Sequence, residues 1–271
     1  MIKTRKRKLA LKGITRCHPS QKTSRKRCLP DSVYKEIAAK LGKQKIDGCA
    51  DDEEHCIVDN APLDESVKKQ LRKQYLRPRR PKAWIAKPNT WLDNYNIMNV
   101  MKQYEEAYPW FSFLGVFPID FSAPDPYRTN GVKQCLNKEL CELNLNTEYD
   151  KGKRGIGMVF NLDPHFKGGS HWVGLYINLE NKEKPFAGYF DSYGYETPKL
   201  IARLMKSFKL QVSTCDLGFN ARRFQYGDSE CGMFSMYFLI CMINGISFKE
   251  FCKDTVNDKF MLDLRKIIFS M

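Results

Sequence analysis

Residues 225–242 read QYGDSECGMFSMYFLICM, and this stretch decides the expected fold. A loop with glycine and acidic residues runs into an apolar segment typical of a buried helix, and Cys231-Gly232 stands at the junction. A thiol at a helix N-terminus faces unpaired backbone N–H groups and the positive end of the helix dipole, which both favour the thiolate. A cysteine beside Met and Phe is more often a core residue, so this stretch alone leaves both interpretations open.

The composition indicates a globular protein with a large basic charge. The chain has 271 residues, of which 42% are hydrophobic, and a formal net charge of +14. This length accommodates one catalytic core and a smaller appendage. Two basic segments, residues 1–28 and residues 68–82, are expected to attract polyanions, among which nucleic acid is the commonest. The first segment is equally typical of a solvated tail or a nuclear-import signal.

The sequence lacks the signals of secretion or membrane insertion. The N-terminal MIKTRKRKLALKGITR has no apolar core of a signal peptide, and the longest apolar run, about residues 233–243, falls short of the ~20 residues that span a bilayer. We therefore expect a soluble intracellular protein, in which the ten cysteines are free thiols. No CxxC pair occurs, so we expect no metal or cofactor, although a zinc site can be assembled on paper from Cys17, His18, Cys28, Cys49, His55 and Cys56.

The hydrophobic pattern predicts three regions and an α+β class. These are a basic flexible arm (1–28), a small helical N-terminal domain (29–82) and a catalytic core (83–271), with the boundary in the proline-rich LRPRRPKAWIAKP. Besides the helix that follows Cys231, helices are expected at about 28–43, 63–76, 90–109 with Thr90 as N-cap, 134–145, 198–208 and 255–269. Strands are expected at 111–121, 155–162, 171–179, 185–191 and 210–217, forming a small mixed or antiparallel sheet packed between helices.

The segment HWVGLYINLENKEKPFAGYFDS (171–192) predicts a β-hairpin that brings two polar residues together. With a turn centred near residue 181 or 182, His171 lies opposite residue 191 or 192, hence beside Asp191. A carboxylate holds an imidazole in one tautomer, and a cysteine at the other ring nitrogen completes a nucleophile, base and orienter. His165, in the loop DPHFKGGS, is a rival base, whereas Cys215 and Cys241 are interpreted as buried thiols.

The order of these residues resembles a known family. His171-Trp172, Asp191, Gln225 and Cys231-Gly232 follow one another as in the cysteine peptidases that include the SUMO/Ulp1-type deconjugases and the adenovirus-type protease, whereas the papain order begins with cysteine. WLDNYNI (91–97) is similar to a further family stretch, so the resemblance covers about residues 83–270. The N-terminal Cys28-Leu29, Gly48-Cys49 and Cys56 resemble the arm of virion-maturation proteases of large nucleo-cytoplasmic DNA viruses, most closely the asfarvirus type.

The resemblance implies a papain-like, Ulp1-like core and a role for each matching residue. Cys231 would be the nucleophile, His171 the base and Asp191 its orienter. Gln225 and the Cys231 backbone N–H would form the oxyanion hole, and Trp91 and Trp172 would form the walls of a tunnel for a Gly-Gly segment. The chain departs from the family pattern at Gly227, where Asn is frequent, and at Glu230, where Asp is common.

The resulting hypothesis is a cysteine endopeptidase that cleaves after Gly-Gly in viral structural polyproteins during virion maturation. Its expected locations are the host cytoplasm or viral factory and the virion, and its expected partners are the polyprotein and, through the basic arm, nucleic acid. The alternatives are a SUMO or ubiquitin-like deconjugating protease with a folded protein substrate, and a catalytically silent nucleic-acid-binding or scaffold protein.

Overall fold

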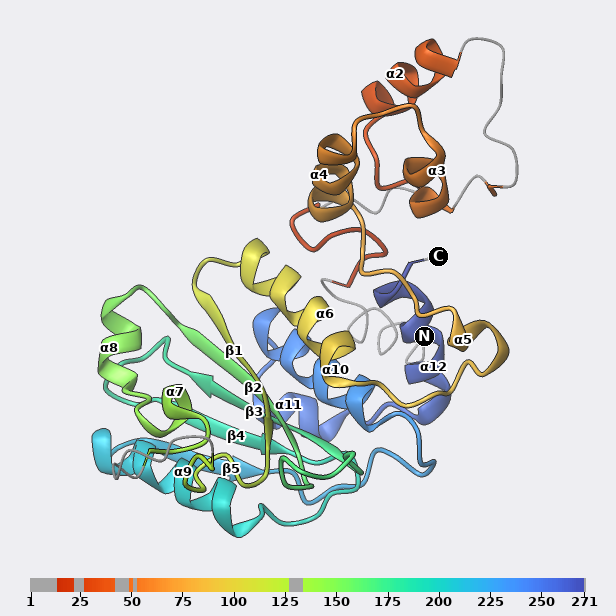
Figure 1. Cartoon of the computed structure of the whole chain (residues 1–271). Helices are drawn as coiled ribbons and strands as arrows, with labels where there is room; N and C mark the ends of the chain where they lie inside the picture. The colour runs from red at the N-terminus through yellow and green to blue at the C-terminus, as the bar shows by residue number, and fades with distance from the viewer. Residues whose placement is uncertain (1–13, 22–26, 42–48, 51–52, 127–133, 271) are drawn as a thin grey trace, which may run out of the picture. The chain divides into compact units, whose positions relative to one another are not determined.

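The computed structural model describes residues 14–21, 27–41, 49–50, 53–126 and 134–270 (Figure 1). The chain divides into two compact units. One comprises Met1–Thr90 together with Leu262–Met271, and the other comprises Trp91–Met261. The larger unit contains every residue of the expected active site.

A five-stranded sheet forms the centre of the larger unit (Figure 1). Its strands, in spatial as well as chain order, are β1 (Phe111–Pro118), β2 (Gly155–Asn161), β3 (Trp172–Asn178), β4 (Phe186–Phe190) and β5 (Asp216–Phe219). The outer pairs β1–β2 and β4–β5 are parallel, and the inner pairs are antiparallel. The expected α+β class with a small mixed sheet is confirmed.

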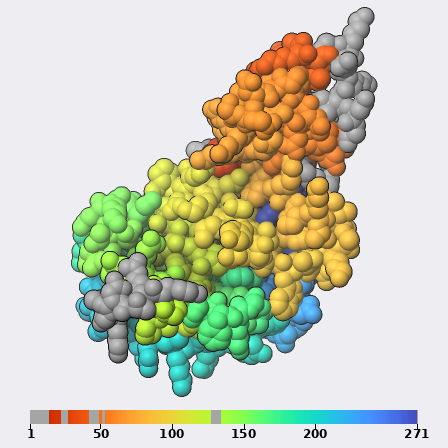
Figure 2. Space-filling model, viewed as in Figure 1, coloured from red at the N-terminus to blue at the C-terminus, as the bar shows by residue number. Residues whose placement is uncertain are grey.

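Helices cover both faces of this sheet, which explains why every residue of β2 is buried. On one face α6 (Asn94–Ala107) packs on β1, and α10 (Cys231–Ile243) packs on β2 and β3. In Figure 2 the yellow side chains of α6 cover part of the sheet from this side. On the other face, α7 (Lys138–Cys141), α8 (Leu145–Asp150) and α9 (Lys199–Gln211) share a hydrophobic core with β2 and β3.

Helix α10 lies very close to the sheet because glycines face it. A Cβ atom at Gly174 would stand 2.9 Å from the Phe238 ring, and one at Gly157 would stand 3.3 Å from Leu239. All 13 residues of α10 are buried. The close packing therefore allows α10 only one position on the sheet, and this fixes the position of its first residue, Cys231.

The smaller unit is helical, as expected for the N-terminal region. It contains α2 (Asp31–Leu41), α3 (Glu54–Asn60), α4 (Glu65–Tyr75) and α5 (Ala83–Ala86) around a core of Leu29, Ile37, Val58, Ala61, Leu63, Leu71 and Leu76. The buried Glu54 carboxylate accepts hydrogen bonds from the backbone N–H groups of Cys28 and Leu29 and from the Tyr34 hydroxyl. These bonds satisfy a carboxylate that would otherwise be costly to bury.

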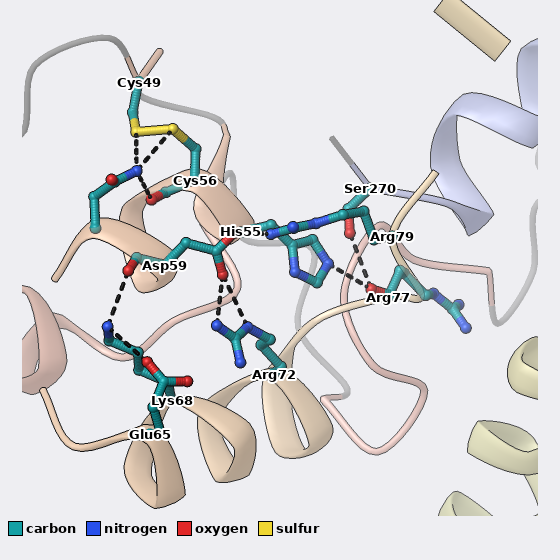
Figure 3. Close-up of polar contacts among 11 residues, drawn as sticks. Cys49, His55, Cys56, Asp59, Glu65, Lys68, Arg72, Arg77, Arg79 and Ser270 are labelled. Atoms are coloured by element: carbon teal, nitrogen blue, oxygen red, sulfur yellow. Dashed lines mark hydrogen bonds and ion pairs between the residues drawn. A yellow bond between two sulfur atoms is a disulfide. The ribbon is translucent and has the colours of Figure 1, made fainter. Parts of the chain in front are cut away.

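Ionic contacts tie α3 and α4 to the segment that follows them (Figure 3). The Asp59 carboxylate binds Arg72 through one oxygen and Arg79 through the other. Burial raises the pKa of Asp59, but the hydrogen bonds to Arg79 and Arg72 outweigh it and lower the pKa. The buried His55 bonds through Nε2 to the Arg77 carbonyl, and burial is the main cause of its lowered pKa.

The C-terminal residues belong to this smaller unit rather than to the core expected for 83–271. The Phe269 ring meets Trp84 edge to face at 4.9 Å, and the Arg265 guanidinium lies 4.6 Å from the Trp84 ring centroid. Arg265 also donates to the carbonyls of Pro88 and Thr90. The division between the units therefore lies at residue 90 instead of 82, since the segment after the proline-rich break packs with the last turns of α12 (Asp258–Ile268).

The expectation of ten free thiols is wrong. Three disulfides pair Cys17 with Cys28, Cys49 with Cys56, and Cys135 with Cys141, which leaves Cys215, Cys231, Cys241 and Cys252 free. Short sequence separations do not reveal such pairs, because pairing needs Cα atoms within about 7 Å. The pairing also removes four of the six ligands of the zinc site assembled on paper.

The first disulfide corrects the expected arm as well. Cys17 and His18 are buried, and the His18 N–H donates to the Tyr75 carbonyl over 2.9 Å. Residues 14–21 and 27–28 are thus part of the packed small unit. The remaining residues of the arm, 1–13 and 22–26, lie outside the described residues.

The pairing predicts a definite thiol count. Alkylation in denaturant without reductant should label four cysteines, and labelling after reduction should reach ten. Each of the two cross-links in the small unit closes a short loop, so its reduction should cost roughly 2–3 kcal/mol of that unit's free energy of unfolding. Mass spectrometry of the labelled protein and denaturant unfolding with and without reductant check both statements; ten labels without reductant would contradict the pairing.

Several element boundaries also differ from expectation. Asp93, not Thr90, is the N-cap of α6 and forms a capping box with Asn96. Helix α9 continues to Gln211, so β5 starts at Asp216 rather than near residue 210. Two short helices, α7 and α8, replace the single helix expected at 134–145, and α3, α5 and α11 (Phe248–Lys253) were not expected. Within the described ranges, no helix has the length and apolar character to cross a membrane.

Candidate active site

His171 and Asp191 meet at the open end of the β3–β4 hairpin. His171 Nε2 lies 2.7 Å from Asp191 Oδ1. The ladder pairs Gly174 with Phe190, so three more residues on each strand would place Tyr193, rather than residue 191 or 192, across from His171. The two side chains are nevertheless joined, because the chain leaves the ladder before this point and Asp191 reaches the imidazole diagonally.

Contacts other than the bond to His171 hold Asp191 in place. Asp191 is 1% exposed, and its Oδ1 also accepts the Tyr193 backbone N–H over 2.8 Å. The Asn220 side chain clamps the Asp191 backbone, accepting from its N–H over 2.8 Å and donating to its carbonyl over 2.7 Å. Sequence reasoning missed Asn220, since its place beside Asp191 depends on the parallel pairing of β4 and β5.

Cys231 completes this arrangement from the first position of α10. Burial lowers the pKa of His171, but hydrogen bonds to Asp191 and to Cys231, with the charges of both, raise it to about 9. Because Asp191 occupies Nε2, the remaining ring nitrogen, Nδ1, serves the thiol. At neutral pH His171 is therefore protonated, and its positive charge lies beside the Cys231 side chain.

This pKa predicts how activity depends on pH. The pKa of His171 is higher in the folded protein, about 9, than its ordinary value of 6.5. The contribution of protonated His171 to the free energy of unfolding is therefore complete below pH 6.5 and is lost as the pH rises through 9. Because catalysis needs the same proton, kcat/KM should fall over the alkaline end of that range. In Asp191→Asn, Oδ1 can still accept from His171, but the charge is gone. We expect kcat to fall about tenfold and the alkaline limb to move down by roughly one unit.

The measurement is a kcat/KM profile from pH 5 to 10 for wild type, Asp191→Asn and Asp191→Ala. The alanine variant also loses the acceptor, so its kcat should fall well below that of the asparagine variant. An alkaline limb at the same pH in wild type and Asp191→Asn would refute the electrostatic role of this carboxylate.

Gln225 is fully buried in the loop that leads to Cys231. Its Oε1 accepts from the Ser192 hydroxyl over 2.7 Å, and its Nε2 donates to the Gly227 carbonyl over 2.9 Å and to the Tyr193 hydroxyl over 3.3 Å. Asp258, the first residue of α12, accepts from the backbone N–H groups of Tyr226 and Gly227. The loop that carries Gln225 is thus fixed on both sides.

Tyr193 is a second residue that sequence reasoning missed. Its ring stacks on the His171 imidazole, with ring centroids 4.8 Å apart and planes inclined by 25°. Its hydroxyl donates to the Gly227 carbonyl over 2.9 Å. The segment DSYG after β4 offered no signal for these contacts, because a tyrosine in a turn is usually a surface residue.

The two tryptophans line a cavity of about 480 Å³. Trp172 Nε1 donates to the Leu92 carbonyl over 3.0 Å, and Trp91 is 51% exposed. Gly232 lies against this wall, since a Cβ there would stand 3.0 Å from Leu92 and 3.2 Å from Trp172. The cavity wall and the start of α10 are therefore packed directly on each other.

The rival histidine is bound to another carboxylate, and the other free thiols are less reactive. His165 lines the same cavity but bonds through Nδ1 to Asp120 over 2.7 Å. Burial raises the pKa of Cys215, that of Cys241 to about 12 and that of Cys252 to about 11. In the part of the chain that the structure describes, no three His, Cys, Asp or Glu side chains are grouped as a metal site would need.

Comparison with known proteins agrees with this geometry. Residues 156–271 match the C-terminal catalytic domain of the Ulp1 protease family. A cysteine protease of African swine fever virus is 25% identical over 260 residues, which cover 91% of this chain and 92% of that protein. A putative thiol protease of Acanthamoeba polyphaga mimivirus is 28% identical over 189 residues, and the match covers 68% of this chain but only 58% of that longer relative. The crystal structure of the African swine fever virus protease shares the fold, with a TM-score of 0.73 at 20% identity over 94% of this chain and 95% of the other.

The fold and these matches define a cysteine protease. More particularly, residues 156–271 are similar to the catalytic domain of the Ulp1 protease family, and the chain is similar, over almost its whole length, to the protease of African swine fever virus. The resemblance inferred from the order of His171, Asp191, Gln225 and Cys231 is thereby confirmed.

Proposed function

We propose that this protein is an endopeptidase that cleaves after Gly-Gly through an acyl-enzyme on Cys231. The observation that carries this proposal is the placement of His171, whose Nε2 lies 2.7 Å from Asp191 Oδ1 and whose pKa is raised by the neighbouring Cys231 side chain as well as by Asp191. A buried thiol paired with an imidazolium at the start of a helix is the arrangement that nucleophilic catalysis by cysteine requires.

Each step then has a donor and an acceptor among these residues. The Cys231 thiolate attacks the scissile carbonyl carbon, and the resulting oxyanion accepts hydrogen bonds from the Gln225 amide and the Cys231 backbone N–H. His171 gives its proton to the leaving amine as the C–N bond breaks, which yields a thioester. His171 then takes a proton from water, whose oxygen attacks the thioester and releases the acid and the thiolate.

The preference for Gly-Gly rests on the walls of the cavity that Trp91 and Trp172 line, against which Gly232 packs. Trp172 is fixed by its bond to the Leu92 carbonyl and by its contact with Gly232, so this wall has little freedom to retreat. Trp91 lines the same cavity. A channel between two indoles admits backbone without side chains, which is the property of glycine.

The biological setting that we propose is maturation of a viral structural polyprotein, in the host cytoplasm or viral factory and in the virion. Its support is the similarity to proteases of two large DNA viruses, which extends over the small N-terminal unit in the African swine fever virus relative. The basic arm would tether the protease to nucleic acid. DNA binding by the full chain should weaken steeply as the salt concentration increases. A dissociation constant that does not change with salt concentration would refute this tethering role.

A deconjugase of SUMO or a ubiquitin-like protein is the second candidate. It is favoured because some African swine fever virus relatives are named SUMO-1 cysteine proteases. The test compares turnover of a SUMO fusion with turnover of short Gly-Gly-X peptides and of Gly-Ala-X and Ala-Gly-X controls. Efficient cleavage of Gly-Gly-X alone supports the endopeptidase. If the SUMO fusion is cleaved at least a hundredfold faster than the peptide with the same Gly-Gly-X sequence, the protein is a deconjugase and the endopeptidase proposal is wrong.

A further inference from the structure

Tyr193 stands where the His171 imidazole and the Gln225 loop come together. The same side chain stacks on the imidazole and bonds to the loop through its hydroxyl. We propose that Tyr193 is a positioning residue that aligns His171 with Cys231 through its ring and Gln225 with the oxyanion through its hydroxyl. This inference rests on the proposed function of those three residues.

The ring supplies a constraint that Asp191 alone does not. A single hydrogen bond at Nε2 fixes one atom of the imidazole, but the ring can still tilt about that point. The Tyr193 ring, 4.8 Å away and nearly parallel, blocks this tilt. The Arg223 guanidinium lies 5.4 Å from the Tyr193 ring centroid and donates to the Gln225 carbonyl over 2.6 Å, so the tyrosine ring is itself supported.

The hydroxyl fixes the other half of the site. It donates to the Gly227 carbonyl over 2.9 Å and accepts from Gln225 Nε2 over 3.3 Å. Gln225 Nε2 also donates to the same Gly227 carbonyl. The three groups form a closed set of hydrogen bonds, which sets the plane of the Gln225 amide. Because both N–H bonds of Nε2 belong to this set, the oxyanion would take over the longer one, to Tyr193, while the hydroxyl keeps its bond to Gly227.

The protonation state of Tyr193 suits this task. Burial and the nearby Cys231 thiolate raise the pKa of Tyr193 above its ordinary value of 10. The hydroxyl therefore keeps its proton over the working pH range and can donate to Gly227 throughout. The Tyr193 backbone N–H, which binds Asp191, is retained in any substitution except proline, so side-chain variants leave the carboxylate in place.

The hydroxyl is tested with Tyr193→Phe, which keeps the ring. Loss of this hydrogen bond should lower kcat for a Gly-Gly-X peptide about tenfold while KM stays within twofold. In a Gln225→Ala background the same substitution should cost less than twofold, because the group that it orients is already absent. A tenfold loss in both backgrounds, or no loss in either, would overturn this half of the inference.

The ring is tested with Tyr193→Leu, read out by alkylation of Cys231 with iodoacetamide. Alkylation needs the thiolate but neither peptide nor oxyanion hole, so it reports only on the pairing of His171 with Cys231. The rate at pH 6 should fall at least threefold in Tyr193→Leu, approaching His171→Ala, and should stay at the wild-type value in Tyr193→Phe. Wild-type reactivity in the leucine variant would overturn the role of the ring.

Tyr195 supplies a matched control. It lies in the same turn, 67% exposed, with its ring centroid 5.9 Å from that of Tyr193. Tyr195→Phe and Tyr195→Leu should match wild type in both assays. If wild type fails to cleave any Gly-Gly-X peptide, the proposed function and the oxyanion half of the inference fall together, whereas the alkylation series still decides the role of the ring.

Discussion

Replacing Cys231 or His171 by alanine is expected to reduce cleavage of Gly-Gly-X peptides by roughly 10⁴- to 10⁶-fold. The first variant removes the nucleophile, and the second removes the imidazolium that stabilises the thiolate and protonates the leaving amine. Because the two residues act as a unit, the double variant should be no slower than either single variant. The comparison of single-turnover rates for the three variants checks this result.

Alkylation of the native protein provides the second arm of this experiment. Six of the ten cysteines are in disulfides, and burial raises the pKa of Cys215, Cys241 and Cys252. A limiting amount of iodoacetamide at pH 7 should therefore modify Cys231 ahead of the other three. The half-buried Cys252 is the matched control, since Cys252→Ala should retain wild-type cleavage. Preferential labelling of any other cysteine would refute the assignment of the nucleophile.

Replacing Gln225 by alanine is expected to lower kcat by about 10²- to 10³-fold with little change in KM. A donor to the oxyanion acts only as the carbonyl becomes tetrahedral, so its loss raises the barrier and leaves ground-state binding intact. The buried amide also makes bonds to Ser192, Gly227 and Tyr193, so a control for local structure is needed.

That control is the rate of Cys231 alkylation, which does not require an oxyanion hole. A Gln225→Ala variant that alkylates at the wild-type rate but cleaves at least a hundredfold more slowly would establish the role of the amide. A kcat within threefold of wild type would remove Gln225 from the mechanism. A parallel loss of alkylation would instead assign Gln225 a purely structural role.

The sequence by itself determined the chemistry and its order along the chain. The apolar run after Cys231 predicts a buried helix, and residues 171–191 predict a β-hairpin. The sequence therefore predicts Cys231 at the start of a helix and His171 near Asp191, although the exact register of the hairpin differs. The family resemblance follows from the same residues, because their order does not depend on how the chain packs.

Tertiary structure decided what lies around these residues. Asn220 and Tyr193 reach the site only through the pairing of β4 with β5 and the turn after β4, and neither leaves a local pattern. The three disulfides and the attachment of residues 262–271 to the small unit likewise join segments whose distance is set by packing. The periodicity of a sequence predicts which face of one helix or strand is buried. It does not predict which other elements pack against that face, because this depends on the whole fold.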